Sequence, residues 1–179
     1  MDYLKYSVLY FVLVTAFYSC GDKKNTNFFE IDKSKIQIEK VQLIPSGNNF
    51  RLVLFSNGVH TFKNVNGADS FVYDDNAVKV YYWLYKAAGS SSYTGEYIYY
   101  LEKDSSANDL TSTFNQAGYF NSGTNGNGIS YQANTGKVNI QEKDGIFEIA
   151  FEFFQRGTNK SPEQVAIKGS YKGIVEIIN

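Results

Sequence analysis

The chain has 179 residues, of which 43% are hydrophobic and 20% are charged. This length and composition predict one globular domain and exclude a disordered chain. The 17 Lys and Arg residues nearly balance the 18 Asp and Glu residues, so the formal charge is −1. Without a basic field, the chain is not expected to bind nucleic acid. The chain contains 15 Gly, 15 Tyr and 14 Phe but only 2 Pro. This composition favours aromatic strands joined by tight turns.

The chain begins with a segment that has the pattern of a signal peptide. Lys5 is the only basic residue before the uncharged run 6–18, which ends just before Ser19 and the single cysteine, Cys20. As a helix this run would be about 20 Å long, too short for a hydrocarbon core of about 30 Å. A removable leader over residues 1–19 is therefore predicted. An ordinary secretory leader with an incidental cysteine is the alternative.

This segment resembles a bacterial lipoprotein signal, in which the cysteine is diacylated and becomes the first residue of the mature chain. Ser19 is the usual small residue before the cysteine, and the bulky Phe17 and Tyr18 are often seen in lipoproteins of Bacteroidota. The resemblance implies lipidation at Cys20 and an anchor in the cell envelope, in the outer membrane, with a periplasmic or surface-facing side left open. Two acyl chains hold a protein stably on a membrane. The polar residues 20–35 are then expected to be a tether.

Residues 36–179 are predicted to form a single antiparallel β-domain, because short alternating apolar runs recur about every ten residues. In the first part of the domain, strands are expected over residues 36–38, 41–44, 50–55, 59–62, 77–86 and 94–103. The run 50–55 is apolar at five of six positions and is predicted to be a central strand. The turn Ser56-Asn57-Gly58 is predicted to join it to residues 59–62 as a hairpin.

The run 77–86 is the strongest strand signal, and its two faces both carry apolar side chains. One face has Val78, Val80, Tyr82 and Leu84, and the other has Lys79, Tyr81, Trp83 and Tyr85. The run 94–103 repeats the pattern and is predicted to pair antiparallel with 77–86.

The last third of the chain has the clearest alternation. Strands are expected over residues 129–133, 138–142, 147–153 and 165–178, after a weaker strand or irregular crossing at 114–120 and a loop at 121–128. Asp144 and Gly145 are typical of a hairpin turn. Gly169 and Gly173 would permit a bulge, a bend or the close packing of an aromatic ring.

Three segments of this last part carry a second resemblance. They are Gly136-Lys-Val-Asn-Ile, Asp144-Gly-Ile-Phe-Glu-Ile-Ala-Phe and Lys168-Gly-Ser-Tyr-Lys-Gly-Ile. This pattern is similar to the C-terminal region of small Bacteroidota lipoproteins of unknown function, some of which have calycin-like barrels. The resemblance implies a calycin-like barrel, with a β-sandwich as the alternative, and it transfers no functional residue.

Catalytic and metal-binding patterns are missing from the sequence. His60 is the only histidine and no G-x-S-x-G motif accompanies it, so it is predicted to make local hydrogen bonds. One His and one Cys cannot supply a zinc site, and Asp74-Asp75-Asn76 lacks the calcium-loop pattern. We expect no catalytic residue, no metal and no cofactor, and a protein that is not an enzyme.

The aromatic strands support two binding hypotheses. In a barrel, an inner face could line a cavity for a small apolar or amphipathic ligand, with candidate residues Tyr82, Trp83, Tyr97, Tyr99 and Phe151. Alternatively, an outer face could bind a glycan or an envelope protein through exposed Tyr81, Trp83 and Tyr85. Simple core and cross-strand packing explains the same residues without a ligand.

Overall fold

The computed structural model describes residues 27–63, 69–100, 112–125, 128–155 and 165–178. The predicted leader, Cys20, the tether up to residue 26 and the end of the strand predicted at 94–103 lie outside these described residues. Every regular element within them is a β-strand, which confirms the all-β prediction. In the same ranges there is no helix with the length and hydropathy needed to cross a bilayer.

The strands are short and follow one another closely along the chain. In order they are β1 (Phe28–Ile31), β2 (Ser34–Gln37), β3 (Lys40–Ser46), β4 (Asn49–Phe55), β5 (Val59–Lys63), β6 (Asp69–Tyr73), β7 (Val78–Tyr85), β8 (Gly95–Tyr99), β9 (Thr113–Asn121), β10 (Ile129–Gln132), β11 (Thr135–Lys143), β12 (Ile146–Gln155), β13 (Val165–Gly173) and β14 (Glu176–Ile177).

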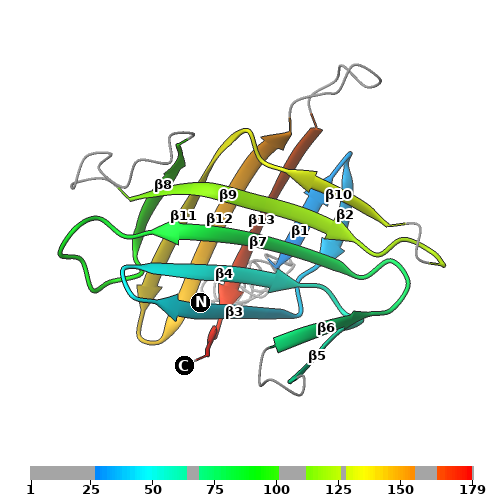
Figure 1. Ribbon diagram of the computed structural model, residues 1–179, viewed down its shortest axis with the longest axis horizontal. Coiled ribbons are helices and arrows are strands. Elements are labelled where there is room, and N and C mark those ends of the chain that lie inside the picture. Colours follow the sequence, from blue (N-terminus) through cyan, green and yellow to red (C-terminus); the bar gives the residue numbers. More distant parts are fainter. Residues whose placement is uncertain (1–26, 64–68, 101–111, 126–127, 156–164, 179) are drawn as a thin grey trace, which may run out of the picture.

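Twelve of the described strands form one curled sheet, and β5 and β6 form a separate hairpin. The order in the sheet is β14-β3-β4-β7-β9-β8-β11-β12-β13-β1-β2, with β10 paired to β9. All pairs are antiparallel except β14 with β3 and β8 with β9. Figure 1 shows β3, β4, β7 and β9 crossing in front of β11, β12 and β13, so the sheet curls into a half-barrel with a front and a back layer.

The core lies between the two layers and follows the alternation of the sequence. Along β7, Val78, Val80, Tyr82 and Leu84 are fully buried, as predicted for one face of this strand. Along β12 the buried side chains are Phe147, Ile149, Phe151 and Phe153. The turn between β11 and β12 is also as predicted, because Asp144 and Gly145 both have positive φ angles, of 55° and 77°.

The prediction of a tether is wrong for residues 28–35, which form β1, a two-residue turn and the first half of β2. Phe29 pairs with Gly169 of β13 and is completely buried, and Ile31 is also part of the core. Polar neighbours hide this strand in the sequence, because only alternate residues of a four-residue strand enter the core. Residues 38 and 39 then connect β2 to β3 on the front layer.

The predicted antiparallel pairing of 77–86 with 94–103 is also wrong, because β9 lies between β7 and β8. β9 pairs with β7 along its length and is a central strand, although its sequence predicted a weak one. The sequence signal of β9 is weak because the strand contains a β-bulge, in which Asn115 is the extra residue between the partners of Trp83 and Leu84. The bulge shifts the alternation, so that Phe114 and Ala117 both face the core.

The predicted hairpin of 50–55 with 59–62 is a third correction. β4 pairs with β3 and β7, whereas β5 pairs with β6. Ser56 exchanges hydrogen bonds with Val78, since its N–H donates to the Val78 carbonyl and its hydroxyl accepts from the Val78 N–H. These hydrogen bonds extend the pairing of β4 with β7 beyond Phe55, so β5 cannot pair with this edge of β4. The turn at Gly58, where φ is 78°, then directs the β5–β6 hairpin out of the sheet.

Candidate functional site

The interior candidates are brought together in the core, with one exception. Tyr82, Tyr97 and Phe151 are buried, and Tyr99 is half-buried against the same core. Their rings contact other rings edge to face: the centroids of Tyr82 and Phe151 are 5.8 Å apart, and those of Tyr99 and Phe114 are 5.4 Å apart. Trp83 does not join them, because it lies on the opposite face of β7. These four side chains pack on each other and on their neighbours as a core does.

The Tyr82 hydroxyl is the unusual polar atom of this core. It is buried and has no hydrogen-bond partner among the described residues, and the Tyr82 ring packs against those of Phe114, Phe151 and Phe153. Burial raises the pKa of Tyr82 well above its usual value. By contrast, the Tyr97 hydroxyl donates to the Tyr93 carbonyl at 2.9 Å, and burial raises its pKa to about 12.

Replacing Tyr82 with Phe is expected to raise the free energy of unfolding by about 1 kcal/mol, because an unpaired buried hydroxyl is destabilising. Urea unfolding followed by circular dichroism measures the change. Tyr97→Phe is the matched control and should destabilise, since it removes a hydroxyl that has a partner. A destabilised Tyr82→Phe protein that also loses a copurified molecule in native mass spectrometry would instead show that a ligand accepts this hydrogen bond.

The outer face of the front layer carries the alternative candidates. Tyr81, Trp83 and Tyr85 lie half-buried on β7, facing away from the core. Beside them, Arg51 of β4 is exposed and its guanidinium carbon is 5.6 Å from the centre of the Trp83 ring. On the other side, Gly118 of β9 leaves room for the Tyr81 ring, since a Cβ there would lie 2.5 Å from a ring carbon. The structure therefore places all three predicted aromatics on one surface.

The β5–β6 hairpin extends this surface with further rings around Lys79. The Lys79 Nζ lies 4.8 Å from the ring centre of Phe71, 5.5 Å from Tyr73 and 5.9 Å from both Tyr81 and Phe120. Burial, and then the charge of Arg51, lower the pKa of Lys79. We call the surface formed by Arg51, Lys79, Tyr81, Trp83 and Tyr85, with Phe71, Tyr73 and Phe120, the aromatic–cationic face.

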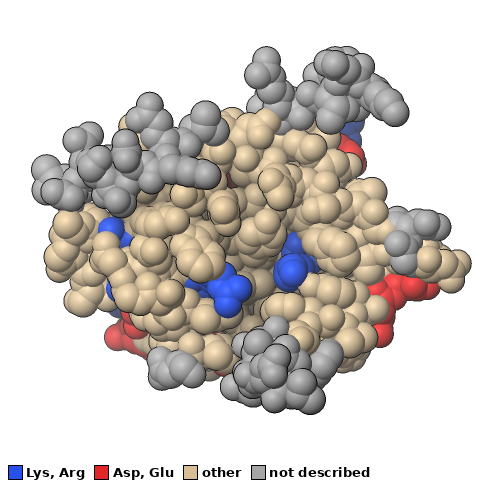
Figure 2. Space-filling view, viewed as in Figure 1, with Lys and Arg blue, Asp and Glu red and all other residues tan. Residues whose placement is uncertain are grey.

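Within the part of the chain that the structure describes, both cations of this face lack an acidic partner. Among the described residues, no carboxylate lies within 4.0 Å of the charged nitrogens of Arg51 or Lys79. Figure 2 shows basic side chains at a hollow near the centre of the front surface, over β4 and β7, with the visible acidic side chains at the periphery. The face can therefore offer ring surfaces and positive charge to the same ligand.

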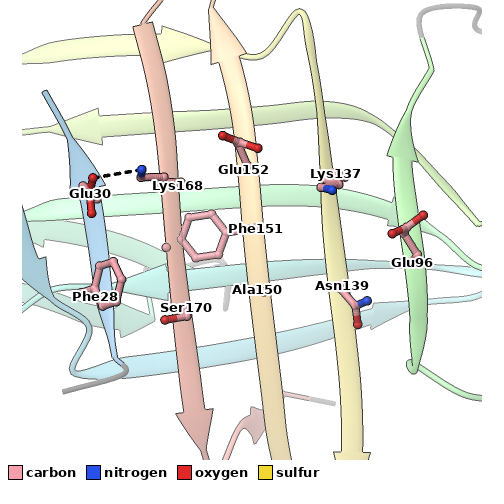
Figure 3. Close-up of a pocket in the computed structure, with 11 residues that line it drawn as sticks. Phe28, Glu30, Glu96, Lys137, Asn139, Ala150, Phe151, Glu152, Lys168 and Ser170 are labelled. Carbon is pink, nitrogen blue, oxygen red and sulfur yellow. Dashed lines mark ion pairs between the residues drawn. The ribbon is translucent and has the colours of Figure 1, made fainter. Parts of the chain in front are cut away.

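A second hollow, of about 550 Å³, lies on the outer face of the back layer. Small residues, Ala150, Gly169 and Ser170, are among those that line it. Figure 3 shows charged side chains from four neighbouring strands across it, and the register places them in one row: Glu30, Lys168, Glu152 and Lys137. Lys168 forms an ion pair with Glu30 at 3.1 Å. Carboxylates thus compensate positive charge here, unlike on the aromatic–cationic face.

Sequence reasoning missed the two cations and the hairpin rings. Lys79 was visible in the alternation with Tyr81 and Trp83, and Arg51 is the only charged residue of its apolar strand. Their meeting depends on the pairing of β4 with β7 and on the position of the β5–β6 hairpin, which the sequence does not specify. The row across the back layer was missed for the same reason, since it depends on the strand order.

His60 and the Asp74-Asp75-Asn76 segment have local roles. His60 Nε2 is 3.1 Å from Asp74 Oδ2, which confirms a local hydrogen bond for this histidine. Asp75 and Asn76 form the turn before β7, where the Asn76 N–H donates to the Gly123 carbonyl and the Asp75 carboxylate accepts from the Asn125 N–H. The described residues contain no group of three potential metal ligands from His, Cys, Asp and Glu.

Comparison of the chain with protein families, with curated proteins and with solved structures finds no match.

Proposed function

We propose that this chain is a non-catalytic binding module of the cell envelope whose aromatic–cationic face binds a glycan. The main observation in support of glycan binding is that Tyr81, Trp83 and Tyr85 face outward on one strand, with Arg51 against the tryptophan ring. Flat rings on a strand form a rigid surface with little conformational entropy to lose, and their faces can stack on sugar rings. The charge-compensated hollow of the back layer is lined by two aromatic residues, Phe28 and the buried Phe151, so it offers less ring surface and is the weaker candidate.

The envelope location in this proposal rests on the first twenty residues. The pattern from Lys5 to Cys20 supports a diacylated lipoprotein, anchored in the outer membrane and facing either the periplasm or the outside. An envelope protein is the other partner that the same face could take.

Replacing Trp83 with Ala is expected to weaken polysaccharide binding about tenfold, which is the loss of about 1.4 kcal/mol of stacking. The measurement is affinity gel electrophoresis of the purified protein against a panel of neutral and acidic polysaccharides. Because Trp83 is the only tryptophan, its emission and its quenching by acrylamide report independently whether the wild-type ring becomes covered.

Phe28→Ala is the matched control for this experiment. Phe28 is also a half-buried outward ring with a cation over it, since Lys35 Nζ is 4.4 Å from its centre, but it lies at the back-layer hollow. Binding should survive Phe28→Ala and fall with Trp83→Ala. A reversed result would assign the glycan to the back layer, and no retardation by any polysaccharide would reject the glycan-binding proposal.

A second candidate function is a carrier of a small apolar or amphipathic ligand in the interior. The observation that favours it is the unpartnered Tyr82 hydroxyl, which a ligand atom could pair. Native mass spectrometry of the purified protein tests it together with the Tyr82→Phe variant. A defined bound molecule that the variant loses would support the carrier, and a bare apo mass would contradict a tightly held ligand.

A further inference from the structure

The aromatic–cationic face has a one-sided charge that the whole chain does not have. By register, the outward side chains of β4, β7 and β9 are those of Asn49, Arg51, Val53, Phe55, Lys79, Tyr81, Trp83, Tyr85, Thr113, Gln116, Gly118 and Phe120. This set contains two cations and no carboxylate, whereas the formal charge of the chain is −1. The asymmetry therefore belongs to this surface and not to the overall composition.

Four other lysines of the described sheet, Lys35, Lys40, Lys168 and Lys172, are paired with carboxylates, whereas Lys137 and Lys143 of β11 are not. Lys40 lies 2.7 Å from Glu176, Lys168 lies 3.1 Å from Glu30, and Lys172 contacts Glu148. Lys79 is half-buried, its ammonium group lies near aromatic rings, and it forms no ion pair with the described residues. A partly buried charge is normally paired, because the loss of hydration is otherwise uncompensated. The rings compensate only in part, since the pKa of Lys79 is still lowered.

Arg51 and Lys79 are arranged to act on one extended ligand. Arg51 pairs with Trp83 across the strands, and Lys79 lies four residues before Trp83 on the same face, a distance of about 13 Å along β7. Tyr81 and Val53 occupy the pair of positions between them. Arg51 and Lys79 carry like charges that repel each other, and after burial this repulsion is the second cause of the lowered pKa of Lys79. A ligand with negative groups would relieve both the repulsion and the missing hydration.

We propose that the glycan bound by this face is an acidic polysaccharide, whose carboxylate or sulfate groups contact Arg51 and Lys79 while its sugar rings stack on Tyr81 and Trp83. This inference rests on the proposed function and specifies its ligand class. A repeating polymer fits better than an acidic peptide, because three rings follow one another on β7 at a spacing of two residues, with Lys79 at one end of this row and Arg51 of β4 beside Trp83. Arg51 can hold a planar carboxylate or a sulfate with two parallel hydrogen bonds, and Lys79 acts as a point charge.

The test uses pairs of polymers that differ in charge. Polygalacturonate is compared with its fully methyl-esterified form, dextran sulfate with dextran, and polyglutamate represents an acidic protein. The expected result is that at least one charged polysaccharide binds at least tenfold more tightly than its neutral counterpart. Lys79→Gln and Arg51→Gln should each weaken this binding about tenfold, since each removes one charge-assisted contact. Lys79→Arg keeps the charge and should retain binding.

The control variant Lys143→Gln changes the net charge equally, at an exposed site in the turn region of β11. It should leave binding unchanged, which separates the site from general electrostatic attraction. Equal binding of charged and neutral polymers, with loss only on Trp83→Ala, would overturn the acidic-ligand inference and keep the proposed function. Binding of polyglutamate alone would overturn the inference and indicate a protein partner. No binding of any polymer would reject both proposals.

Discussion

Replacing Phe151 with Ala is expected to lower the free energy of unfolding by about 3–5 kcal/mol. The side chain is only 4% exposed, and its ring centre is 5.8 Å from Tyr82 and 6.2 Å from Phe29, so it joins the front layer to both β12 and β1. Removing the ring leaves a cavity between strands that are held apart by the rest of the core, and the surroundings can close it only in part. Urea unfolding measures the loss.

The control for this prediction is Ile98→Ala on β8, because Ile98 is 54% exposed and should contribute less than about 0.5 kcal/mol. The comparison bears on function as well as on stability. Phe151 is one of the residues that the sequence suggests for an interior ligand site, and a large stability loss in the ligand-free protein means that its ring is needed for packing. A change as small as that of Ile98→Ala would mean that Phe151 borders an open cavity.

The strands themselves could be predicted from local patterns. The alternation in β7 and β12 identifies their buried faces correctly, and the Asp144-Gly145 turn fixes the β11–β12 hairpin. Each of these features depends on residues that are close in sequence, so that side-chain period and turn chemistry are sufficient.

The strand order could not be predicted, because it depends on interactions between distant segments. The bulge at Asn115 disguises β9, and only the complete sheet shows that this strand separates β7 from β8. β1 is too short to show a period, and its partner β13 lies more than a hundred residues away. Local sequence patterns give no information on which distant strands pair with each other.

The candidate site divides in the same way. Tyr81, Trp83 and Tyr85 are on one face by simple alternation, which the sequence shows directly. Lys79 becomes distinctive only when the β5–β6 hairpin brings Phe71 and Tyr73 over it. That no described carboxylate pairs with Lys79 is likewise a property of the folded surface. Whether a charged residue on a strand is paired, or is available to a ligand, can therefore be judged only when its neighbours across the sheet are known.

Replacing Gly169 with Ala is expected to destabilise the protein by about 3 kcal/mol through overpacking. A Cβ at this position of β13 would overlap the carbonyl oxygen of Phe28 and lie 2.5 Å from Cζ of Phe151. The Phe28 oxygen belongs to the backbone of β1 and cannot rotate away, so β1, together with its other neighbour β2, must move away from β13. Of the bulge, the bend and the close aromatic packing that the sequence left open for this glycine, the structure shows close packing against Phe151.

Gly47→Ala is the control that separates this steric effect from backbone strain. Gly47 has a φ of +62° and no atom within 4 Å of its Cβ position, so alanine there adds only the strain of a left-handed conformation, about 1 kcal/mol. Gly169→Ala should in addition speed hydrogen exchange of the β1 amides, because that strand loses its place beside β13. Equal destabilisation by the two variants, with β1 still protected, would mean that β1 does not approach β13 so closely. Detachment of β1 would also uncover Phe29, which connects the start of the described chain to the core below the front layer.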